Sequence, residues 1–265
     1  MSLPRPDGPI YLLHIPRTGG TTLRELIARR FPRERCFLGG SRKRFAESMA
    51  AMSAEQREQL LFVSGHYDAS VGRLLGTRPR IVTMLREPAA RLRSHYEIVK
   101  RMPEHRLNAE VLAGMTFLEW LDHPLGGAAE ENRMTRQIAG VMDGTGARGE
   151  GEGSGDGAAR LRGAALLDRA RDHLADFAFF GLREAYEDSL RLLAHTFGWP
   201  PFGEPPCLNA TGAPILTAAE REIVLARNSL DAELYRLAWR RFRGRVARLD
   251  FLAIPHVSAP THRSA

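Results

Sequence analysis

Residues 14–23, His-Ile-Pro-Arg-Thr-Gly-Gly-Thr-Thr-Leu, have the composition of an anion-binding loop. They follow a short apolar run and precede a helical pattern, so the loop ends at a helix N-terminus, where unpaired backbone N–H groups and the helix dipole attract negative charge. Gly19 and Gly20 let the backbone approach a ligand closely, and Arg17 adds a full positive charge. Hydroxyl donors come from three threonines, Thr18, Thr21 and Thr22.

The loop differs from two common phosphate-binding motifs. A Walker P-loop requires a lysine directly after its last glycine, and Thr21 stands there. The spacing also differs from the G-x-G-x-x-G of dinucleotide-binding proteins. A Gly-Gly pair alone is equally compatible with an ordinary tight turn, so the loop predicts an anion site without naming the ligand.

A second candidate anion contact lies in residues 86–96, Arg-Glu-Pro-Ala-Ala-Arg-Leu-Arg-Ser-His-Tyr. Arg86 would leave the end of a strand with a fork of donors suited to phosphate oxygens. Ser94 would lie about two turns into the following helix, on the same face as Arg91. Considered alone, Arg86 is most simply a surface ion-pair partner and Ser94 a solvent-facing serine. Considered together with the first loop, the two residues are candidates for a second phosphate contact.

Strand and helix patterns alternate along the chain. Short apolar runs predict buried strands at 9–15, 35–38, 60–65, 80–85 and 176–181. Helical spacing is found at 21–31, 54–59, 88–100, 116–122, 130–139, 160–174, 184–197, 218–228 and 231–242. Thr21 or Thr22 could cap the first helix, and Pro88 suits the first turn of the helix that follows 80–85. This alternation predicts an α/β fold with a mostly parallel sheet flanked by helices.

Length and composition set the expected organisation. The 265 residues, 43% of them hydrophobic, fit a single domain over 1–265 with its core at about 10–242. The Gly-rich stretch 141–158 is expected to be a flexible loop and 255–265 a loose tail. No apolar run approaches the roughly 20 residues of a membrane span, and the first residues lack a signal-peptide core, so a cytoplasmic protein is expected.

The net charge of +7 favours anionic partners. No zinc-finger spacing or RNA-binding aromatic pattern is present, so nucleic acid is not an expected partner. The two cysteines, Cys36 and Cys207, have no metal-like spacing and are expected to be ordinary thiols. No other set of residues suggests a metal site.

The two candidate anion segments together resemble the signature of the sulfotransferases that use 3′-phosphoadenosine 5′-phosphosulfate (PAPS). Residues 14–22 resemble the family's 5′-phosphosulfate loop, H-I-P-K-T-G-G-T-[ST], except that Arg17 stands where the family has lysine. Residues 86–96 resemble its 3′-phosphate motif, R-[DE]-P-x-x-R-x-x-S-x-Y. The resemblance is nearest to the branch of carbohydrate and heparan sulfate 2-O-sulfotransferases with its bacterial members, and it spans about 10–242 apart from the Gly-rich stretch.

The resemblance implies a P-loop-NTPase-like three-layer fold and transfer of a sulfuryl group from PAPS to a hydroxyl acceptor. PAPS would be the donor substrate, without a metal, and the acceptor hydroxyl would belong to a glycan or glycolipid. Arg86 and Ser94 would hold the 3′-phosphate. The complete set of implied donor-binding residues is Arg17, Thr18, Gly19, Gly20, Thr21, Thr22, Arg86 and Ser94.

Two residues are predicted to act in the transfer itself. His66 follows the strand at 60–65 and is the candidate base for the acceptor hydroxyl, because an imidazole titrates near neutral pH. Arg17 would stabilise charge on the leaving phosphate, although a guanidinium is a poor general acid. Asn132 and Arg136 would either line the substrate cleft or fix the loop beneath it.

Two alternatives stay open. Arg17 in place of lysine is compatible with a protein that binds PAPS or its product and turns it over little. The second alternative is a P-loop-like nucleotide kinase, although the missing Walker lysine and the pairing of Arg86 with Ser94 argue against it.

Overall fold

The computed structural model describes residues 8–40, 42–142, 163–203 and 214–253. Its centre is a five-stranded sheet with the order β2-β3-β1-β4-β5, and every strand pair is parallel. The strands are β1 (Ile10–Leu13), β2 (Cys36–Leu38), β3 (Phe62–Gly65), β4 (Arg80–Leu85) and β5 (Phe179–Leu182). The predicted α/β class, with a mostly parallel central sheet flanked by helices, is confirmed, and the described sheet is parallel throughout.

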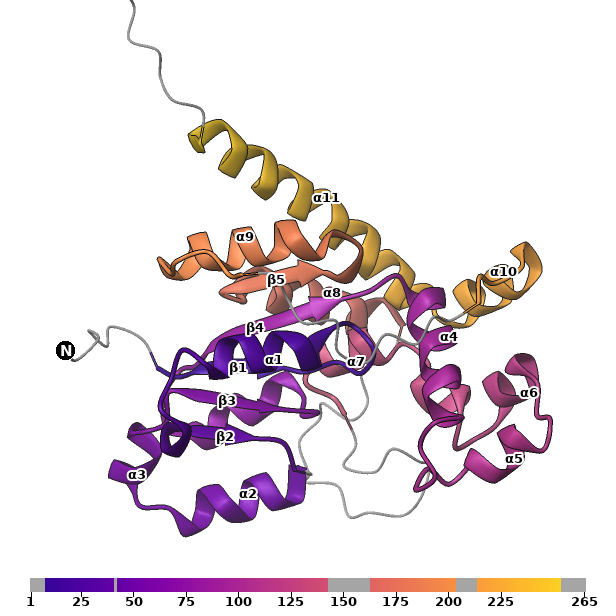
Figure 1. Cartoon of the computed structure of the whole chain (residues 1–265), viewed down its shortest axis with the longest axis horizontal. Coiled ribbons are helices and arrows are strands. Elements are labelled where there is room, and N and C mark those ends of the chain that lie inside the picture. Colours follow the sequence, from indigo (N-terminus) through magenta and orange to yellow (C-terminus); the bar gives the residue numbers. More distant parts are fainter. Residues whose placement is uncertain (1–7, 41, 143–162, 204–213, 254–265) are drawn as a thin grey trace, which may run out of the picture.

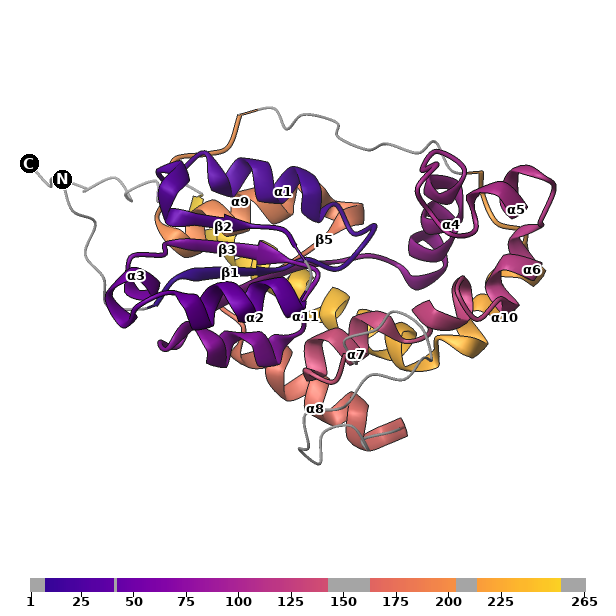
Figure 2. The same cartoon turned by 90° about the horizontal axis from the view of Figure 1, so that it is seen from below.

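Helices cover both faces of the sheet. The helices are α1 (Gly20–Ala28), α2 (Arg42–Ala51), α3 (Ala54–Glu58), α4 (Pro88–Val99), α5 (Asn108–Leu112), α6 (Phe117–Asp122), α7 (Arg133–Ala139), α8 (Gly163–Asp176), α9 (Tyr186–Phe197), α10 (Ala218–Arg227) and α11 (Ser229–Ala253). Figure 2 shows α1 and α9 on one side of the sheet and α2, α7 and α8 on the other. Helix α11 contacts β5, α8 and α9, while α4, α5, α6 and α10 lie together beyond the ends of the strands (Figure 1).

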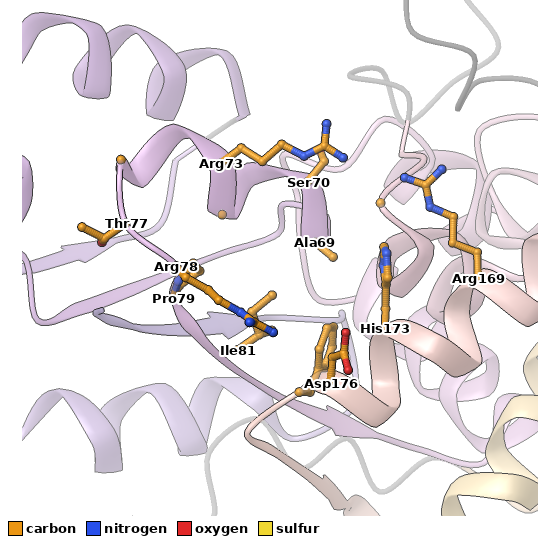
Figure 3. Close-up of a pocket in the computed structure, with 14 residues that line it drawn as sticks. Ala69, Ser70, Arg73, Thr77, Arg78, Pro79, Ile81, Arg169, His173 and Asp176 are labelled. Carbon is orange, nitrogen blue, oxygen red and sulfur yellow. The ribbon is translucent and has the colours of Figure 1, made fainter. Parts of the chain in front are cut away.

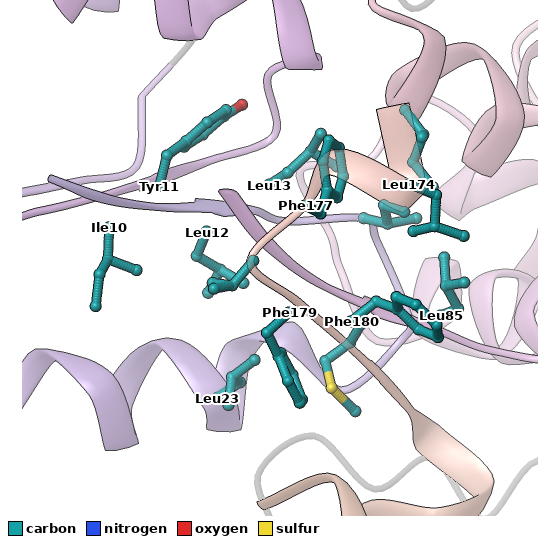
Figure 4. Close-up of a cluster of buried hydrophobic side chains, with 14 of the residues drawn as sticks. Ile10, Tyr11, Leu12, Leu13, Leu23, Leu85, Leu174, Phe177, Phe179 and Phe180 are labelled. Atoms are coloured by element: carbon teal, nitrogen blue, oxygen red, sulfur yellow. The ribbon is translucent and has the colours of Figure 1, made fainter. Parts of the chain in front are cut away.

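The central strand β1 is buried on both faces. Ile10 and Leu12 lie on the side of α1, where they approach Leu23, whereas Tyr11 and Leu13 point to the opposite side (Figure 4). Strands covered by helices on both faces read as continuous apolar runs, which is the pattern that the sequence shows here. A second apolar cluster joins α4, α5, α6 and α10 and includes Trp120.

The local predictions are accurate for most elements and wrong at the start of α1. The strand at 80–85 and the helix starting at Pro88 have the expected positions. Neither Thr21 nor Thr22 caps α1: the cap residue is Gly19, in the left-handed conformation with φ +88°, and the helix start has no side-chain cap. Two helices, α2 and α5, were not predicted, and α11 extends beyond the expected 231–242.

Some expectations fall where the structure gives no description. The Gly-rich stretch from 143 onward, the tail after 253 and Cys207 lie outside the described residues. The single-domain organisation stays a prediction. Among the described helices, none combines the length and apolar character needed to cross a membrane.

Candidate functional site

The two predicted anion segments meet because β1 and β4 are neighbours in the sheet. Their parallel register pairs Leu13 with Thr83, and the Thr83 hydroxyl donates to the Leu13 carbonyl at 2.8 Å. Parallel neighbours end at the same edge, so the loop after β1 and the segment after β4 leave the sheet side by side. The strand order of the sheet therefore brings together two segments that lie about 70 residues apart in the chain.

Arg17, Arg86 and Ser94 are in direct contact. Arg17 donates from Nε and from Nη2 to the Ser94 hydroxyl, at 3.1 Å each. Arg86 donates from Nη1 to the Arg17 carbonyl at 3.0 Å. The structure therefore brings the predicted 5′ and 3′ contact residues to one place, while their roles toward a donor stay predictions.

The backbone and side chain of Arg17 are both unusual. Its φ of +67° lies in the left-handed region, which non-glycine residues rarely adopt and which is often found at functional sites. Burial, and then the nearby charges of Arg86 and Arg101, lower the pKa of Arg17 to about 10. The side chain stays positive at neutral pH, and it does so in a region of concentrated positive charge.

The two glycines of the loop are required for different reasons. Gly19 has the left-handed φ, and its carbonyl accepts a hydrogen bond from the Tyr186 hydroxyl at 3.2 Å. A Cβ on Gly20 would lie 2.2 Å from Cδ2 of His14, so only glycine fits against the buried imidazole. The fully buried Thr18 donates its hydroxyl to the Ile15 carbonyl at 2.9 Å. These contacts hold the loop in a defined shape.

His66 leaves the end of β3, the other neighbour of β1. Its Nδ1 lies 2.9 Å from the carbonyl oxygen of His14, and the two imidazole rings are 4.3 Å apart. Because a carbonyl only accepts, Nδ1 carries the proton and Nε2 keeps its lone pair. Although part of His66 is accessible to solvent, desolvation by the surrounding protein is the largest influence on its pKa and lowers it. The bond to the His14 carbonyl offsets this effect only in part.

His14 is a buried partner of this arrangement. It is 5% exposed, and burial, followed by the proximity of His66, holds its pKa well below the ordinary value of 6.5. The ring is therefore neutral at neutral pH. The buried, neutral ring packs against Gly20 at the junction of β1 and the loop, as a structural residue does.

Gln137 on α7 is a site residue that the sequence analysis missed. Its side-chain nitrogen donates to the carbonyls of His14, at 3.1 Å, and Tyr67, at 2.6 Å. It therefore binds the same His14 carbonyl as His66 and also the carbonyl of Tyr67, the residue that follows His66. Its place in the predicted helix 130–139 was visible in the sequence, but nothing local distinguished it from the flanking polar residues.

The side chains of Asn132 and Arg136 make contacts within the protein. Asn132 has a left-handed φ of +49°; its Oδ1 accepts from the backbone N–H groups of Leu230 and Asp231, and its Nδ2 donates to Arg227. Arg136 donates to the carbonyl of Ala129 at 2.6 Å. The bonds of Asn132 connect the start of α7 to the end of α10 and the start of α11. The bond of Arg136 connects α7 to the short 3-10 turn that precedes it in the chain. The predicted substrate contacts of the two residues stay predictions.

A buried acid between α4 and α7 is a second feature that the sequence analysis missed. Glu130 accepts from Arg91 at 2.7 Å, and it also pairs with Arg133 and lies 3.5 Å from His95. Arg91 is fully buried and also donates to the Glu130 carbonyl at 2.9 Å. Burial alone would raise the pKa of Glu130, but the nearby Arg133, His95 and Arg91 outweigh it and hold that pKa well below 4.5.

This ion pair orients the helix that carries Ser94. Arg91 and Ser94 are both fully buried on α4, which agrees with the shared helix face that their three-residue spacing predicted. Within the described part of the chain, no three or more His, Cys, Asp or Glu side chains come together as a metal site.

Comparisons with known proteins give limited similarity. No protein-family model matches the sequence, and no curated protein does. Among solved structures, the chain is similar to the crystal structure of mouse sulfotransferase SULT7A1 complexed with PAP, with 14% sequence identity and a TM-score of 0.37. The match covers 85% of this chain and 65% of that chain, so this chain spans somewhat less than two thirds of that protein's length.

Proposed function

We propose that this chain is a sulfotransferase that binds PAPS and transfers its sulfuryl group to a hydroxyl acceptor. The observation that supports this most is the contact of Arg17 with Ser94 and Arg86, which connects the loop before α1 to α4 and to the residue at the end of β4. PAPS carries anionic groups on both its 5′ and 3′ positions, so it needs two anion contacts that the fold holds together. The resemblance of residues 14–22 and 86–96 to the two PAPS motifs assigns one contact to each end.

In this proposal, different residues bind different parts of the donor. The backbone of Thr18, Gly19 and Gly20 at the N-terminus of α1 holds the 5′-phosphosulfate, with the hydroxyls of Thr21 and Thr22 around it. Arg86 and Ser94 hold the 3′-phosphate. Arg17 and Arg101 add positive charge to the same region, which favours a donor with several negative charges.

The transfer follows from these positions. Nε2 of His66 takes the proton of the acceptor hydroxyl while the acceptor oxygen attacks sulfur in line with the leaving oxygen. The new O–S bond forms as the bond from sulfur to the 5′-phosphate oxygen breaks, and 3′-phosphoadenosine 5′-phosphate (PAP) leaves. Arg17 stabilises the negative charge that develops on the departing phosphate. The proton on His66 then passes to solvent.

Ligand-induced stabilisation tests the donor site without any knowledge of the acceptor. Saturating PAP is expected to raise the melting temperature by about 5–10 °C, because a ligand at a hundred times its dissociation constant contributes about 2.7 kcal/mol. AMP, which lacks the 3′-phosphate, is expected to raise it by less than about a third as much. Differential scanning fluorimetry measures both shifts.

The control for this measurement is Arg86→Ala, which removes the main proposed 3′-phosphate ligand. In this variant, the stabilisation by PAP is expected to fall to that by AMP. Equal shifts by PAP and AMP in the unsubstituted protein would show that the chain has no 3′-phosphate site.

The base assignment makes a kinetic prediction. His66→Ala is expected to lower kcat about a hundredfold or more while the donor still stabilises the protein. Since the pKa of His66 is lowered, its basic form predominates at neutral pH, and the rate is expected to rise with pH and to level off below the ordinary histidine pKa of 6.5. Formation of PAP from PAPS over pH 4.5–8 gives the profile.

His195→Ala is the matched substitution, because His195 is exposed on α9 and makes no contact with the loop. It is expected to keep the turnover and the pH profile of the original protein. Unchanged turnover of His66→Ala at saturating acceptor would remove His66 from the mechanism.

The acceptor is proposed to be a hydroxyl group of a glycan or glycolipid, following the resemblance to the carbohydrate sulfotransferases. Incubation with radiolabelled PAPS and bacterial glycan and metabolite extracts, followed by identification of the labelled product, tests this directly. Label in a small phenol or amine would contradict the acceptor class but keep the activity. Magnesium-dependent use of ATP without binding of PAPS would instead favour the kinase alternative.

A further inference from the structure

A pocket away from the candidate donor site lies on the face of the sheet that α1 does not cover. It has a volume of about 470 Å³, within the range of small-molecule sites, and lies between the 3-10 segment Ala69–Leu75, the turn that leads into β4, and α8 (Figure 3). Its floor includes Ile81, which pairs with Tyr11 near the start of β1. The anion loop follows the other end of β1, and the pocket shares no residue with 14–22 or 86–94.

Three arginines from three separate segments converge on this pocket. Arg73 comes from the 3-10 segment, Arg78 from the turn before β4 and Arg169 from α8. Figure 3 shows the guanidinium groups of Arg73 and Arg169 reaching toward the same opening above His173, with Arg78 lower down beside Asp176. Among the described residues, Asp176 is the only acid in the lining, and it lies low in the pocket near Arg78, away from the guanidinium groups of Arg73 and Arg169 (Figure 3).

The guanidinium groups have no competing partners in the described part of the chain. Arg73, Arg78 and Arg169 make no hydrogen bond or ion pair with any residue that the structure describes, whereas several arginines elsewhere in the chain do. Like charges that converge without an acid repel one another, and an anion placed between them relieves this repulsion. The upper part of the pocket therefore fits a negatively charged group.

His173 adds a polar group of defined orientation. Its Nδ1 lies 2.8 Å from the carbonyl oxygen of Ile138, so Nδ1 donates and Nε2 is the nitrogen left for a ligand. Below it, Ile81, Phe177 and Pro79 supply apolar surface. A cationic opening above an apolar floor fits a ligand that combines an anionic group with an apolar body.

The walls of the pocket are held firmly. A Cβ on Gly72 would lie 2.9 Å from Cγ of Pro79, and one on Gly140 would lie 3.2 Å from the backbone nitrogen of Ser70. The buried carboxylate of Asp68 accepts from the backbone of Ser70 at 2.9 Å and from Met142 at 3.2 Å, which joins the 3-10 segment to the chain after α7. The pocket is thus formed before any ligand arrives.

We propose that this pocket is a binding site for a small organic anion, namely a flat apolar body that carries one sulfate, phosphate or carboxylate group. Arg73 and Arg169 bind the anionic group, and the surface formed by Ile81, Phe177 and Pro79 receives the apolar body. The site is separate from the proposed donor site, and its existence does not depend on the sulfotransferase activity.

Isothermal titration with simple probes tests the site. The anionic probes are para-nitrophenyl sulfate, para-nitrophenyl phosphate and para-nitrobenzoate, and the controls are the uncharged para-nitrobenzyl alcohol and inorganic sulfate and phosphate. At least one anionic aromatic probe is expected to bind one to one and more tightly than both kinds of control. Arg73→Gln and Arg169→Gln are each expected to weaken that binding roughly tenfold, the effect of one lost charge-assisted hydrogen bond.

The matched substitution is Arg243→Gln, which removes the same charge from an exposed position on α11 outside the pocket. It is expected to change the affinity less than twofold, and saturating PAP is expected to leave the affinity unchanged. The proposal is overturned if para-nitrobenzyl alcohol binds as tightly as the anionic probes, if inorganic phosphate or sulfate does so, or if Arg243→Gln weakens binding as much as Arg169→Gln. Loss of binding when PAP is present would place the probe in the donor site and would also overturn it.

Discussion

Arg17→Ala is expected to lower the rate of sulfuryl transfer from PAPS about a hundred- to a thousandfold, the effect of removing one preorganised group that stabilises a developing negative charge. Arg17 is the residue of the loop that carries a full charge, and it lies against Ser94 at 3.1 Å, in the region where the leaving phosphate is proposed to lie. Its backbone shape is set by Gly19, Gly20 and the buried His14, so the loop is expected to keep its form when the side chain is removed.

Arg17→Lys separates the need for charge from the need for a guanidinium. Lysine provides a compact charge that can also donate a proton to the leaving oxygen, while it gives up one of the two bonds to Ser94. The lysine variant is expected to turn over PAPS within about tenfold of the original rate, because charge supplies most of the stabilisation. Arg29→Ala, at an exposed position at the end of α1, is the matched control and is expected to be fully active.

The measurement is formation of PAP and of sulfated product from radiolabelled PAPS, with the melting temperature of each variant as the test of folding. Activity of Arg17→Ala within a few fold of the original rate would show that Arg17 does not stabilise the leaving group. An inactive original protein that becomes active as Arg17→Lys would favour the alternative of a PAPS-binding protein with little turnover.

The largest loss of stability is expected from Glu130→Ala, at about 3–5 kcal/mol. The substitution removes the acid from a fully buried Arg91, which is 2.7 Å away, and leaves that guanidinium without its charge partner. For a domain of this size, the melting temperature is expected to fall by roughly 10 °C or more. Glu104→Ala, at an exposed position, is the matched control and is expected to change stability by less than about 0.5 kcal/mol.

The charge of Glu130 also makes a prediction about pH. Its pKa in the folded protein lies well below the ordinary value of 4.5, so its contribution to stability is complete above pH 4.5 and decreases as the pH falls toward the folded-state pKa. Glu130→Gln, which keeps the shape and loses the charge, is therefore expected to differ most from the original protein at pH 7 and less at pH 4. Urea unfolding at the two pH values measures the difference, and an equal difference at both would contradict a charge effect.

The sequence predicted those parts of the fold that are determined by residues adjacent in the chain. The apolar run 80–85 and Pro88 predicted β4 and the start of α4, because burial on both faces and a fixed proline φ are properties of a few adjacent residues. The anion loop was accessible for the same reason: its glycines, its arginine and the following helix are contiguous in the chain. Even there, the prediction of a threonine cap was wrong, since the left-handed Gly19 begins α1 without one.

The tertiary structure alone decided which distant residues meet. Arg17 contacts Ser94 because β1 and β4 are neighbours in the sheet, and Arg91 finds Glu130 39 residues further along the chain. Gln137 and the convergence of Arg73 with Arg169 have no local signature, because any polar residue on a helix or turn has the same pattern in the sequence. Periodicity and turn chemistry act over a few residues, whereas ion pairs and pockets are set by how whole helices pack on the sheet.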